Sequence, residues 1–342
     1  MKTVKPKIYV TRRIPQPGLD LLATAFEVEV NSHDRVATRE ELIAGVQGKD
    51  ALLCLLTDKI DAAVMDAAGP GLRVIANYAV GFDNVDVPAA TLRGIPVTNT
   101  PGVLTDTTAD LAFALLMATA RRVVEADRFM RAGMYRGWGP MLFLGQDIHH
   151  KTLGIVGLGR IGRAMAERAA GFHMRILYTN TTATRAEAST NDTGPSKAIE
   201  KKLNAEFREL PDLLRESDFV SLHVPLTEST HHLISDAAFD LMKRTAILIN
   251  TSRGPVVDEK ALVRALKMGK IAGAGLDVYE REPECEPELR ELDNVVMVPH
   301  IASASVETRT KMATMAAENA VAAIRGEVPP NLVNPEVWDR KR

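Results

Sequence analysis

Residues 152–171 read TLGIVGLGRIGRAMAERAAG. The apolar run Thr152–Val156 predicts a buried strand, and Arg163–Gly171 has the spacing of an amphipathic helix. Between them lie three glycines, Gly157, Gly159 and Gly162, in the spacing G-x-G-x-x-G. In that order they allow a tight turn, a close approach of the backbone to a pyrophosphate, and close packing of the helix on the strand. The helix N-terminus adds unpaired N–H groups and a positive dipole end, so the stretch predicts a dinucleotide-binding turn.

The rest of the chain alternates short apolar runs with helical patterns, which is typical of parallel sheets covered by helices on both faces. Six strands are predicted after residue 150, the count of a doubly wound dinucleotide-binding domain: Thr152–Val156, Arg175–Tyr178, Phe219–Leu222, Ala246–Ile249, Ala272–Leu276 and Val295–Val298. An earlier series has predicted strands at Lys7–Val10, Phe26–Val30, Ala51–Leu56 and Leu72–Ala76, with helices at Gly18–Ala25, Thr38–Gly45 and Asp61–Ala68. The sequence therefore predicts an α/β protein with two such domains.

Other segments join or extend these two series. The turn cluster Asn99–Gly102 ends the first series, and a long helix is expected over 105–122 as a link between the domains. Met134–Gln146 is rich in Gly, Trp, Phe and Met without a clear period, which predicts an extended arm. Thr181–Lys202 is predicted to be a solvated loop running into a helix, and a last helix is expected at Ser305–Arg325.

Composition excludes several classes of protein. The 342 residues, 46% hydrophobic and 25% charged, are enough for two globular domains. With 42 basic and 44 acidic residues, the chain lacks the positive surface that nucleic acid or anionic lipid requires. Cys54 and Cys285 cannot form a disulfide framework or a four-cysteine zinc site, which favours a reducing compartment. No apolar stretch approaches the roughly 18 residues of a membrane span, and no histidines have convincing metal-ligand spacing. We expect a soluble cytoplasmic protein without a metal.

The segment after the second strand of the dinucleotide domain bears on the choice of cofactor. Roughly 20 residues beyond the glycines, an acidic residue normally binds the ribose hydroxyls, but here the position holds Asn180. Hydroxyl side chains and Arg185 follow, and a guanidinium can bind a 2′-phosphate. NADP is therefore favoured, with NAD as the alternative. The alternative interpretation of Arg185 is an ordinary solvated loop residue.

Three polar residues follow predicted strands of the second series, namely Arg253, Glu282 and His300. Open α/β sheets bind ligands at the carboxyl ends of their strands. A guanidinium can bind a carboxylate through two hydrogen bonds, and an imidazole can give or take a proton near neutral pH. A carboxylate beside the imidazole would orient it and keep it protonated. The alternatives are a surface ion pair for Arg253, a solvated acidic face for Glu282 and a helix cap for His300.

Longer segments carry a family resemblance over about Pro6 to Asn334. Besides the glycine turn they are Asn77–Asn84, Val97–Asp106, Ser221–Thr227, Asn250–Gly254, Gly273–Val278 and Pro299–Ile301. In these segments the chain resembles the D-2-hydroxyacid dehydrogenases, and most of all their glyoxylate/hydroxypyruvate reductase branch.

The resemblance implies a domain organisation. A discontinuous substrate-binding domain, 1–104 and 301–342, would be flavodoxin-like, and 105–300 would form a Rossmann NAD(P)-binding domain, with a cleft between the two. The segment Met134–Gln146 resembles the family's dimerisation arm, which implies a homodimer in which Trp138 reaches a neighbouring subunit. The alternative for Trp138 is local packing within its own chain.

The resemblance also implies an activity. Arg253, Glu282 and His300 would be the catalytic triad. The N–H groups of Val80 and Gly81 would bind the substrate carboxylate together with Arg253, and His300 would also contact the substrate. The nicotinamide would pass a hydride to C2 of a small 2-keto acid while protonated His300 gives a proton to the carbonyl oxygen. The expected cofactor contacts include the glycines, Asn180 and Arg185 named above. The full set is Thr105, Gly157, Leu158, Gly159, Arg160, Ile161, Gly162, Asn180, Thr181, Thr182, Arg185, Thr251, Ser252 and Asp277.

Three features depart from the family's pattern. Thr181 stands where NADP-binding members usually have an arginine, about ten residues are inserted around Ser189–Ala198, and Ala302 replaces the usual glycine after His300-Ile301. The sequence leaves open another substrate on the same fold, such as D-lactate, phosphoglycerate or phosphite, and also a nucleotide-sensing binding protein.

Overall fold

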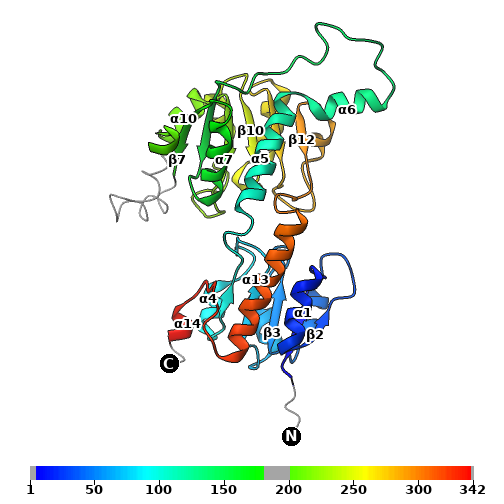
Figure 1. The fold of residues 1–342 in the computed structure, drawn as a ribbon, viewed down its shortest axis with the longest axis vertical. Helices are drawn as coiled ribbons and strands as arrows, with labels where there is room; N and C mark the ends of the chain where they lie inside the picture. Colours follow the sequence, from blue (N-terminus) through cyan, green and yellow to red (C-terminus); the bar gives the residue numbers. More distant parts are fainter. Residues whose placement is uncertain (1–4, 181–200, 340–342) are drawn as a thin grey trace. The chain divides into compact units, whose positions relative to one another are not determined.

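The computed structural model describes residues 5–180 and 201–339, which belong to two compact units (Figure 1). Unit 1 comprises Met1–Leu104 and Ser303–Arg342, and unit 2 comprises Thr105–Ala302. Ile301 and Ala302 stay with unit 2 because their N–H groups donate to the Asp277 carboxylate at 2.6 and 2.8 Å.

Unit 1 contains a five-stranded parallel sheet in the order β2-β1-β3-β4-β5. Its strands are β1 (Lys7–Val10), β2 (Glu27–Val30), β3 (Ala51–Cys54), β4 (Val74–Asn77) and β5 (Val97–Thr98). Its helices are α1 (Gln16–Ala25), α2 (Arg39–Val46), α3 (Ala62–Ala68), α4 (Val87–Leu92), α13 (Val306–Arg325) and α14 (Glu336–Asp339). This strand order is that of flavodoxin-like doubly wound sheets.

Helices cover both faces of this sheet, which is why β3 and β4 are buried along their whole length. On one face α13 packs against α1 and the central strands (Figure 1). The two helices approach so closely that a Cβ on Gly18 would lie 2.7 Å from the Cβ of Ala313. On the other face, buried residues of α2, α3 and α4 pack with the strands in a hydrophobic core. Side-chain caps begin α2, α3, α4 and α13, with Thr38 and Glu41 forming a capping box at α2 and Ser305 capping α13.

Unit 2 contains a seven-stranded parallel sheet in the order β12-β11-β10-β9-β6-β7-β8. Its strands are β6 (Thr152–Val156), β7 (Arg175–Thr179), β8 (Glu206–Phe207), β9 (Phe219–Leu222), β10 (Ile247–Asn250), β11 (Gly273–Leu276) and β12 (Val295–Met297). Its helices are α5 (Thr105–Ala120), α6 (Val123–Arg131), α7 (Arg160–Ala170), α10 (Leu210–Glu216), α11 (Asp236–Leu241) and α12 (Glu259–Lys267), with 3₁₀ turns η1 (Gly254–Val256) and η2 (Pro287–Glu291). The order reverses between β6 and β9, as in the Rossmann fold, with one additional strand.

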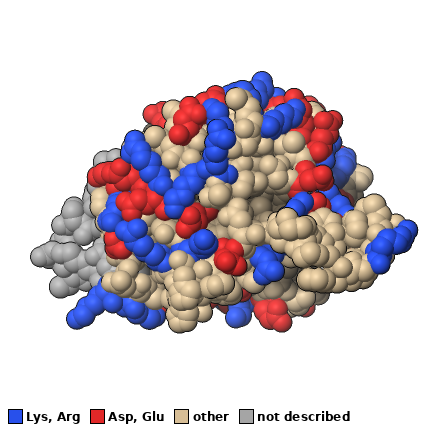
Figure 2. Space-filling view, turned by 90° about the horizontal axis from the view of Figure 1, so that it is seen from above, with Lys and Arg blue, Asp and Glu red and all other residues tan. Residues whose placement is uncertain are grey.

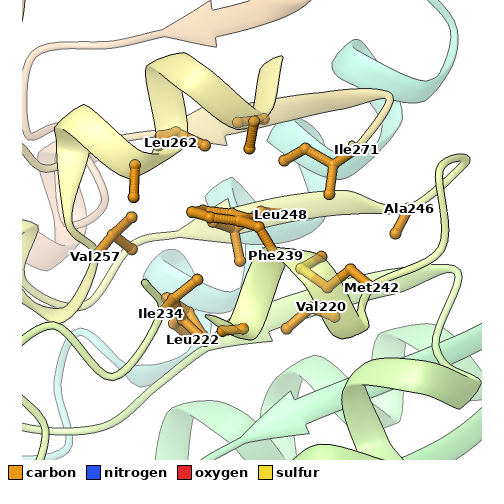
Figure 3. Packing of buried hydrophobic residues seen from close by; sticks show 14 of the residues in the cluster. Val220, Leu222, Ile234, Phe239, Met242, Ala246, Leu248, Val257, Leu262 and Ile271 are labelled. Atoms are coloured by element: carbon orange, nitrogen blue, oxygen red, sulfur yellow. The ribbon is translucent and has the colours of Figure 1, made fainter. Parts of the chain in front are cut away.

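The sheet of unit 2 separates two hydrophobic cores, because successive strand residues point to opposite faces. On one face α5 and α7 pack on a core that includes Leu153 and Ile155. On the other face Phe239 and Leu262 pack over Leu248 of the central strands (Figure 3). Both cores hold the strands rigidly, so the loops at the strand ends start from fixed positions.

The surface carries charges of both signs. Figure 2 shows basic and acidic side chains interleaved on one face, without a large region of one sign. Within the described residues, no helix is both long and apolar enough to cross a membrane.

Most predicted elements are confirmed, and β1, β6 and β9 have the predicted bounds. Several other elements, such as β3, β4 and α1, differ from their predicted bounds by one or two residues. The sheet of unit 1 has a fifth strand, β5, where only four strands were predicted. Three expectations for unit 2 are also wrong. The helix after the glycine turn begins at Arg160, three residues earlier than expected, so Gly162 lies inside its first turn. The helix expected over 105–122 ends at Ala120, because Arg122 has a left-handed backbone (φ 53°) and α6 begins after it. The sheet has a seventh strand, β8, whose two residues are too few to show a period.

Candidate active site

The glycine turn joins β6 to α7 at the carboxyl end of the sheet. Gly157 has a φ of +98°, and a Cβ there would lie 2.7 Å from the carbonyl oxygen of His223. A Cβ on Gly162 would lie 2.1 Å from the carbonyl oxygen of Gly157, so only glycine lets α7 start this close to the turn. Gly159, the N-cap of α7, differs because a Cβ there would meet no atom within 4 Å. This open space at the N-terminus of an 11-residue helix fits a phosphate.

Asn180 ties this turn to the neighbouring strand. It follows β7, and its side-chain carbonyl accepts a hydrogen bond from the N–H of Leu158 at 2.8 Å. The other three residues expected near the ribose, Thr181, Thr182 and Arg185, lie outside the residues that the structure describes.

The loop after β10 carries Arg253. Buried Asn250 accepts hydrogen bonds from the N–H and the hydroxyl of Ser252, at 3.0 and 2.8 Å, and donates to the carbonyl oxygen of Arg253 at 3.0 Å. The Arg253 guanidinium donates through Nη1 to the carbonyl oxygen of Ser252 at 2.9 Å. Thr251 is buried, and its hydroxyl has no hydrogen-bond partner among the described residues. Because buried polar groups are nearly always paired, this hydroxyl fits a site that receives a polar ligand.

His300 and Glu282 form a hydrogen-bonded pair. His300 has a left-handed backbone (φ 53°), and its Nδ1 lies 2.9 Å from Oε2 of Glu282. The other oxygen of Glu282 accepts the N–H of Tyr279 at 3.0 Å. Burial raises the pKa of Glu282, but the hydrogen bond and charge of His300, the Tyr279 amide and the charge of Arg253 outweigh it, so the pKa is lowered. Glu282 is therefore an anion at neutral pH that fixes the imidazole through Nδ1.

Asp277 supports the His300 segment from β11. Its side chain is fully buried, and its two oxygens accept the N–H groups of Ile301 and Ala302. Its backbone carbonyl accepts the N–H of His300 at 2.9 Å. Burial raises the pKa of Asp277 to about 6, against the lowering effects of the two amides and of His300. Asp277 thus fixes the backbone of the segment that carries the imidazole, and its contact with a cofactor stays a prediction.

In unit 1, hydrogen bonds hold three successive carbonyl groups in the loop after β4. The carbonyls are those of Ala79, Val80 and Gly81, held by the N–H of Thr100 at 2.9 Å and by the side-chain amides of Asn99 and Asn77, each at 2.8 Å. The N–H of a trans peptide points away from its carbonyl, so these bonds also fix the direction of the N–H groups of residues 80–82. Among the described residues, none accepts the N–H of Val80 or Gly81. Fixed adjacent N–H groups of this kind can bind an anion.

The structure thus brings together part of the predicted set. Within unit 2, the His300–Glu282 pair, the Arg253 loop and the glycine turn all lie at carboxyl ends of strands. Thr105 begins α5, and Val80 and Gly81 belong to unit 1. Among the described residues, no cluster of three or more His, Cys, Asp or Glu side chains could hold a metal ion.

Sequence reasoning missed several supporting residues, including Asn77, Asn99 and Glu259. The asparagines offer no periodic signal, since their hydrogen bonds depend on the path of the loop. Glu259 does offer one, because it shares a helical face with Leu262, Val263 and Leu266, at i+3, i+4 and i+7, and all four are buried.

Comparisons with known proteins agree with this arrangement. The family profile of the NAD binding domain of the D-isomer specific 2-hydroxyacid dehydrogenases matches residues 113–302. The chain is 56% identical over 336 residues to a glyoxylate reductase of Korarchaeum cryptofilum, covering 98% of this chain and 97% of the relative. It is 55% identical over 338 residues to a glyoxylate reductase of Pyrococcus horikoshii, covering 98% and 97%.

Solved structures are similar over almost the same length. A protein of Thermus thermophilus superposes with a TM-score of 0.85 at 46% identity, covering 96% of this chain and 99% of that one. An NADPH-dependent glyoxylate/hydroxypyruvate reductase of Sinorhizobium meliloti, solved with NADP and malonate, has a TM-score of 0.81 at 33% identity, covering 96% and 97%. Family profile, full-length identity and fold agree, and the chain belongs to the D-isomer specific 2-hydroxyacid dehydrogenases, oxidoreductases with a nicotinamide dinucleotide as cofactor.

Proposed function

We propose that the protein reduces glyoxylate and hydroxypyruvate to D-2-hydroxy acids with a reduced nicotinamide dinucleotide. The observation that carries the proposal is the hydrogen-bonded His300–Glu282 pair. Arg253 is close enough to lower the pKa of Glu282. All three residues follow strands at the carboxyl-terminal edge of the sheet, where the glycine turn also lies. The identity of more than half with two glyoxylate reductases, over nearly the whole chain, supports the same substrate class.

The two units have different tasks in this proposal. Unit 2 binds the dinucleotide, since the open space at Gly159 fits a phosphate and the unpaired hydroxyl of Thr251 fits a polar ligand. Unit 1 binds the carboxylate of the substrate through the N–H groups of Val80 and Gly81, whose directions are fixed by the hydrogen bonds on their neighbouring carbonyls.

When bound, the reduced nicotinamide supplies a hydride to C2 of the keto acid. His300 holds the proton that the carbonyl oxygen receives, and it gives this proton from Nε2 because Glu282 binds Nδ1. The Glu282 anion keeps the ring in one orientation and favours its protonated form. The Arg253 guanidinium binds the substrate carboxylate and polarises the carbonyl group that accepts the hydride.

The proposed cofactor is NADP(H) in preference to NAD(H). No carboxylate stands at Asn180 to repel a 2′-phosphate, and the Asn180 carbonyl is bound to Leu158. Arg185 follows as a possible phosphate ligand, and a neighbour of similar fold is NADPH-dependent. Replacing Arg185 by Ala should therefore raise the KM for NADPH much more than the KM for NADH. An equal effect on both cofactors would contradict this assignment.

A homodimer is proposed from the surface of α6 and the following arm. Large apolar side chains are exposed there, with Trp138, Met141 and Leu144 being 83%, 76% and 57% accessible, and Met130 of α6 56%. Clusters of exposed apolar side chains mark interaction surfaces. Sedimentation equilibrium should give twice the chain mass, and Trp138→Ser with Met141→Ser should shift the protein towards monomer. A monomeric wild-type protein would contradict the proposal.

The proposed location is a reducing compartment such as the cytoplasm. It is supported by the two cysteines, Cys54 and Cys285, which are both free.

The reductase activity is tested by the loss of reduced-nicotinamide absorbance with glyoxylate and with hydroxypyruvate. The wild-type protein should consume the cofactor rapidly with both substrates. His300→Ala should lose about 10²- to 10⁴-fold in kcat, the range that general acid catalysis supplies, and still bind the dinucleotide. His149→Ala, which removes an exposed imidazole from the same unit, is the matched control and should keep full activity. A His300→Ala enzyme as active as the control would contradict the proton-donor role.

A further inference from the structure

Glu259 is a buried carboxylate that takes no part in the proposed hydride and proton transfer. It is the first residue of α12, and only 3% of it is exposed. Its hydrogen bonds come from main-chain amides: Oε1 accepts the N–H of Glu280 at 2.6 Å, and Oε2 accepts the N–H of Glu286 at 2.9 Å. No basic side chain of the described residues forms an ion pair with it. Burial raises the pKa of Glu259, while these two amides act to lower it. A buried carboxylate that has no cation nearby needs hydrogen-bond donors to offset the loss of water. For Glu259 these donors are the main-chain amides of residues 280 and 286.

The two amides lie on either side of the residue that binds the imidazole. Between Glu280 and Glu286 the chain makes a tight turn, in which the N–H of Glu284 donates to the carbonyl oxygen of Arg281 at 2.9 Å. Glu282 lies within that turn and reaches Nδ1 of His300. A single carboxylate therefore holds both ends of the segment that carries Glu282.

The contact is reciprocal at the first end of the segment. The Glu280 side chain accepts the N–H of Glu259 at 3.2 Å, and its other oxygen lies 2.8 Å from Nε2 of His232. The start of α12, the His232 loop and the turn with Glu282 are thus joined by polar contacts that fix the segment at its base. None of these groups contacts His300, and within the segment they hold it is Glu282 that contacts the imidazole.

We infer that Glu259 is a positioning residue for the His300–Glu282 pair, acting by clamping the main chain of residues 280–286. The inference rests on the proposed reductase function. It has a physical basis in the sensitivity of proton transfer to geometry, since a displacement of about 1 Å in a reacting group can cost about 10²-fold in rate. The Glu282 carboxylate reaches His300 through a single hydrogen bond, so a shift of the turn would weaken that bond directly.

The test uses Glu259→Gln, which keeps the size of the side chain but leaves one acceptor oxygen for two N–H donors. The kcat should fall about 10- to 100-fold, within the range that a positioned general acid supplies. The pH above which kcat declines should move to lower values, because a loosened Glu282 stabilises the protonated imidazole less. Hydrogen exchange of the Glu280 and Glu286 amides should accelerate, and the Kd for the dinucleotide should stay as in wild type.

A double-mutant cycle separates positioning from a general loss of structure. If Glu259 acts through Glu282, then Glu259→Gln should change kcat by less than about twofold in a Glu282→Gln background. Asp218→Asn is the matched control, because Asp218 also binds a main-chain amide, that of Thr152 at 2.9 Å, but at the opposite end of the same sheet. Its small effect on kcat should be unchanged by Glu282→Gln, and it should not move the pH profile.

Additive losses for Glu259→Gln and Glu282→Gln, or a pH profile identical to that of wild type, would overturn the inference. Failure of the proposed function would show differently, as a wild-type protein that reduces neither glyoxylate nor hydroxypyruvate. Glu259→Asp covers the case in which the glutamine variant folds poorly. Its shorter carboxylate should retain the fold but reach only one amide, and it should give an intermediate kcat and an intermediate pH profile.

Discussion

Adding a methyl group at two glycines of the same turn should change different properties, namely stability at Gly162 and dinucleotide binding at Gly159. At Gly162 the Cβ of alanine would lie 2.1 Å from the carbonyl oxygen of Gly157, although real Cβ atoms almost never approach closer than 3.0 Å. The start of α7 or the turn itself must therefore move by at least 3.0 − 2.1 = 0.9 Å. Overpacking of this kind costs about 1–3 kcal/mol, against about 1 kcal/mol regained from helix propensity. We expect Gly162→Ala to lower the free energy of unfolding by up to about 2 kcal/mol.

Gly159→Ala should leave stability almost unchanged and impair binding instead. The φ of Gly159 is −74°, which alanine adopts readily, and no atom lies within 4 Å of the added Cβ. A smaller unfolded-state entropy favours alanine by about 0.4–1 kcal/mol, and the loss of a favourable N-cap residue opposes it by a similar amount. The methyl group would occupy the space assigned to the phosphate, so the Kd for the dinucleotide should rise at least about tenfold, or about 1.4 kcal/mol.

The assay pairs two measurements on both variants. Urea unfolding followed by circular dichroism gives the stability, and fluorescence titration with NADPH and NADH gives the affinity. The reasoning would be refuted by a Gly159→Ala protein that binds both dinucleotides within about twofold of wild type, or by one that is as unstable as Gly162→Ala.

Three further changes test other parts of the account. Glu282→Gln should lower kcat about 10²-fold and move the basic decline of kcat to lower pH, measured in steady-state assays; an unchanged pH profile would contradict the role of this anion beside His300. Asn99→Ala frees the carbonyl of Val80 and should raise the KM for glyoxylate about tenfold while the dinucleotide Kd stays constant, as separate titrations can check. Burial lowers the pKa of His223 to about 4, so the unfolded chain binds more protons than the folded one between about pH 6.5 and 4. The free energy of unfolding should therefore fall over that range by up to about 3 kcal/mol more in wild type than in His223→Gln, because the opposing effect of Asp277, whose pKa is raised to about 6, is present in both proteins. An equal pH dependence in the two proteins would argue against this cause.

The fold could be predicted well because its signals are local. Strands such as β6 and β9 are apolar runs buried on both faces, and the glycine turn is a contiguous motif whose two flanks can be read directly. The two-residue strands β5 and β8 escaped prediction, since a pair of residues has no period. The early start of α7 escaped as well, because it depends on how closely Gly162 packs on Gly157, which is a three-dimensional constraint.

The candidate site was only partly predictable. Arg253, Glu282 and His300 could be singled out because each follows a strand at the carboxyl edge of a sheet. Asn250 could not, since it acts on main-chain groups whose neighbours are set by the tertiary fold. Glu259 was missed although its place on the buried face of α12 gave a periodic signal, because that signal does not say which main-chain amides the carboxylate binds. Asp277 illustrates the difference, because a residue expected to face the cofactor uses both carboxylate oxygens to hold the amides after His300.

Stereospecific transfer of a hydride to C2 of a 2-keto acid, with a proton from His300, can be followed with an isotope. The protein is incubated with hydroxypyruvate and a reduced dinucleotide that carries deuterium on the transferred position of C4, and the product is analysed by mass spectrometry and chiral chromatography. We expect D-glycerate with one deuterium at C2, formed at least about 10²-fold more slowly by His300→Ala. Unlabelled product, the L-isomer, or no glycerate at all would contradict it.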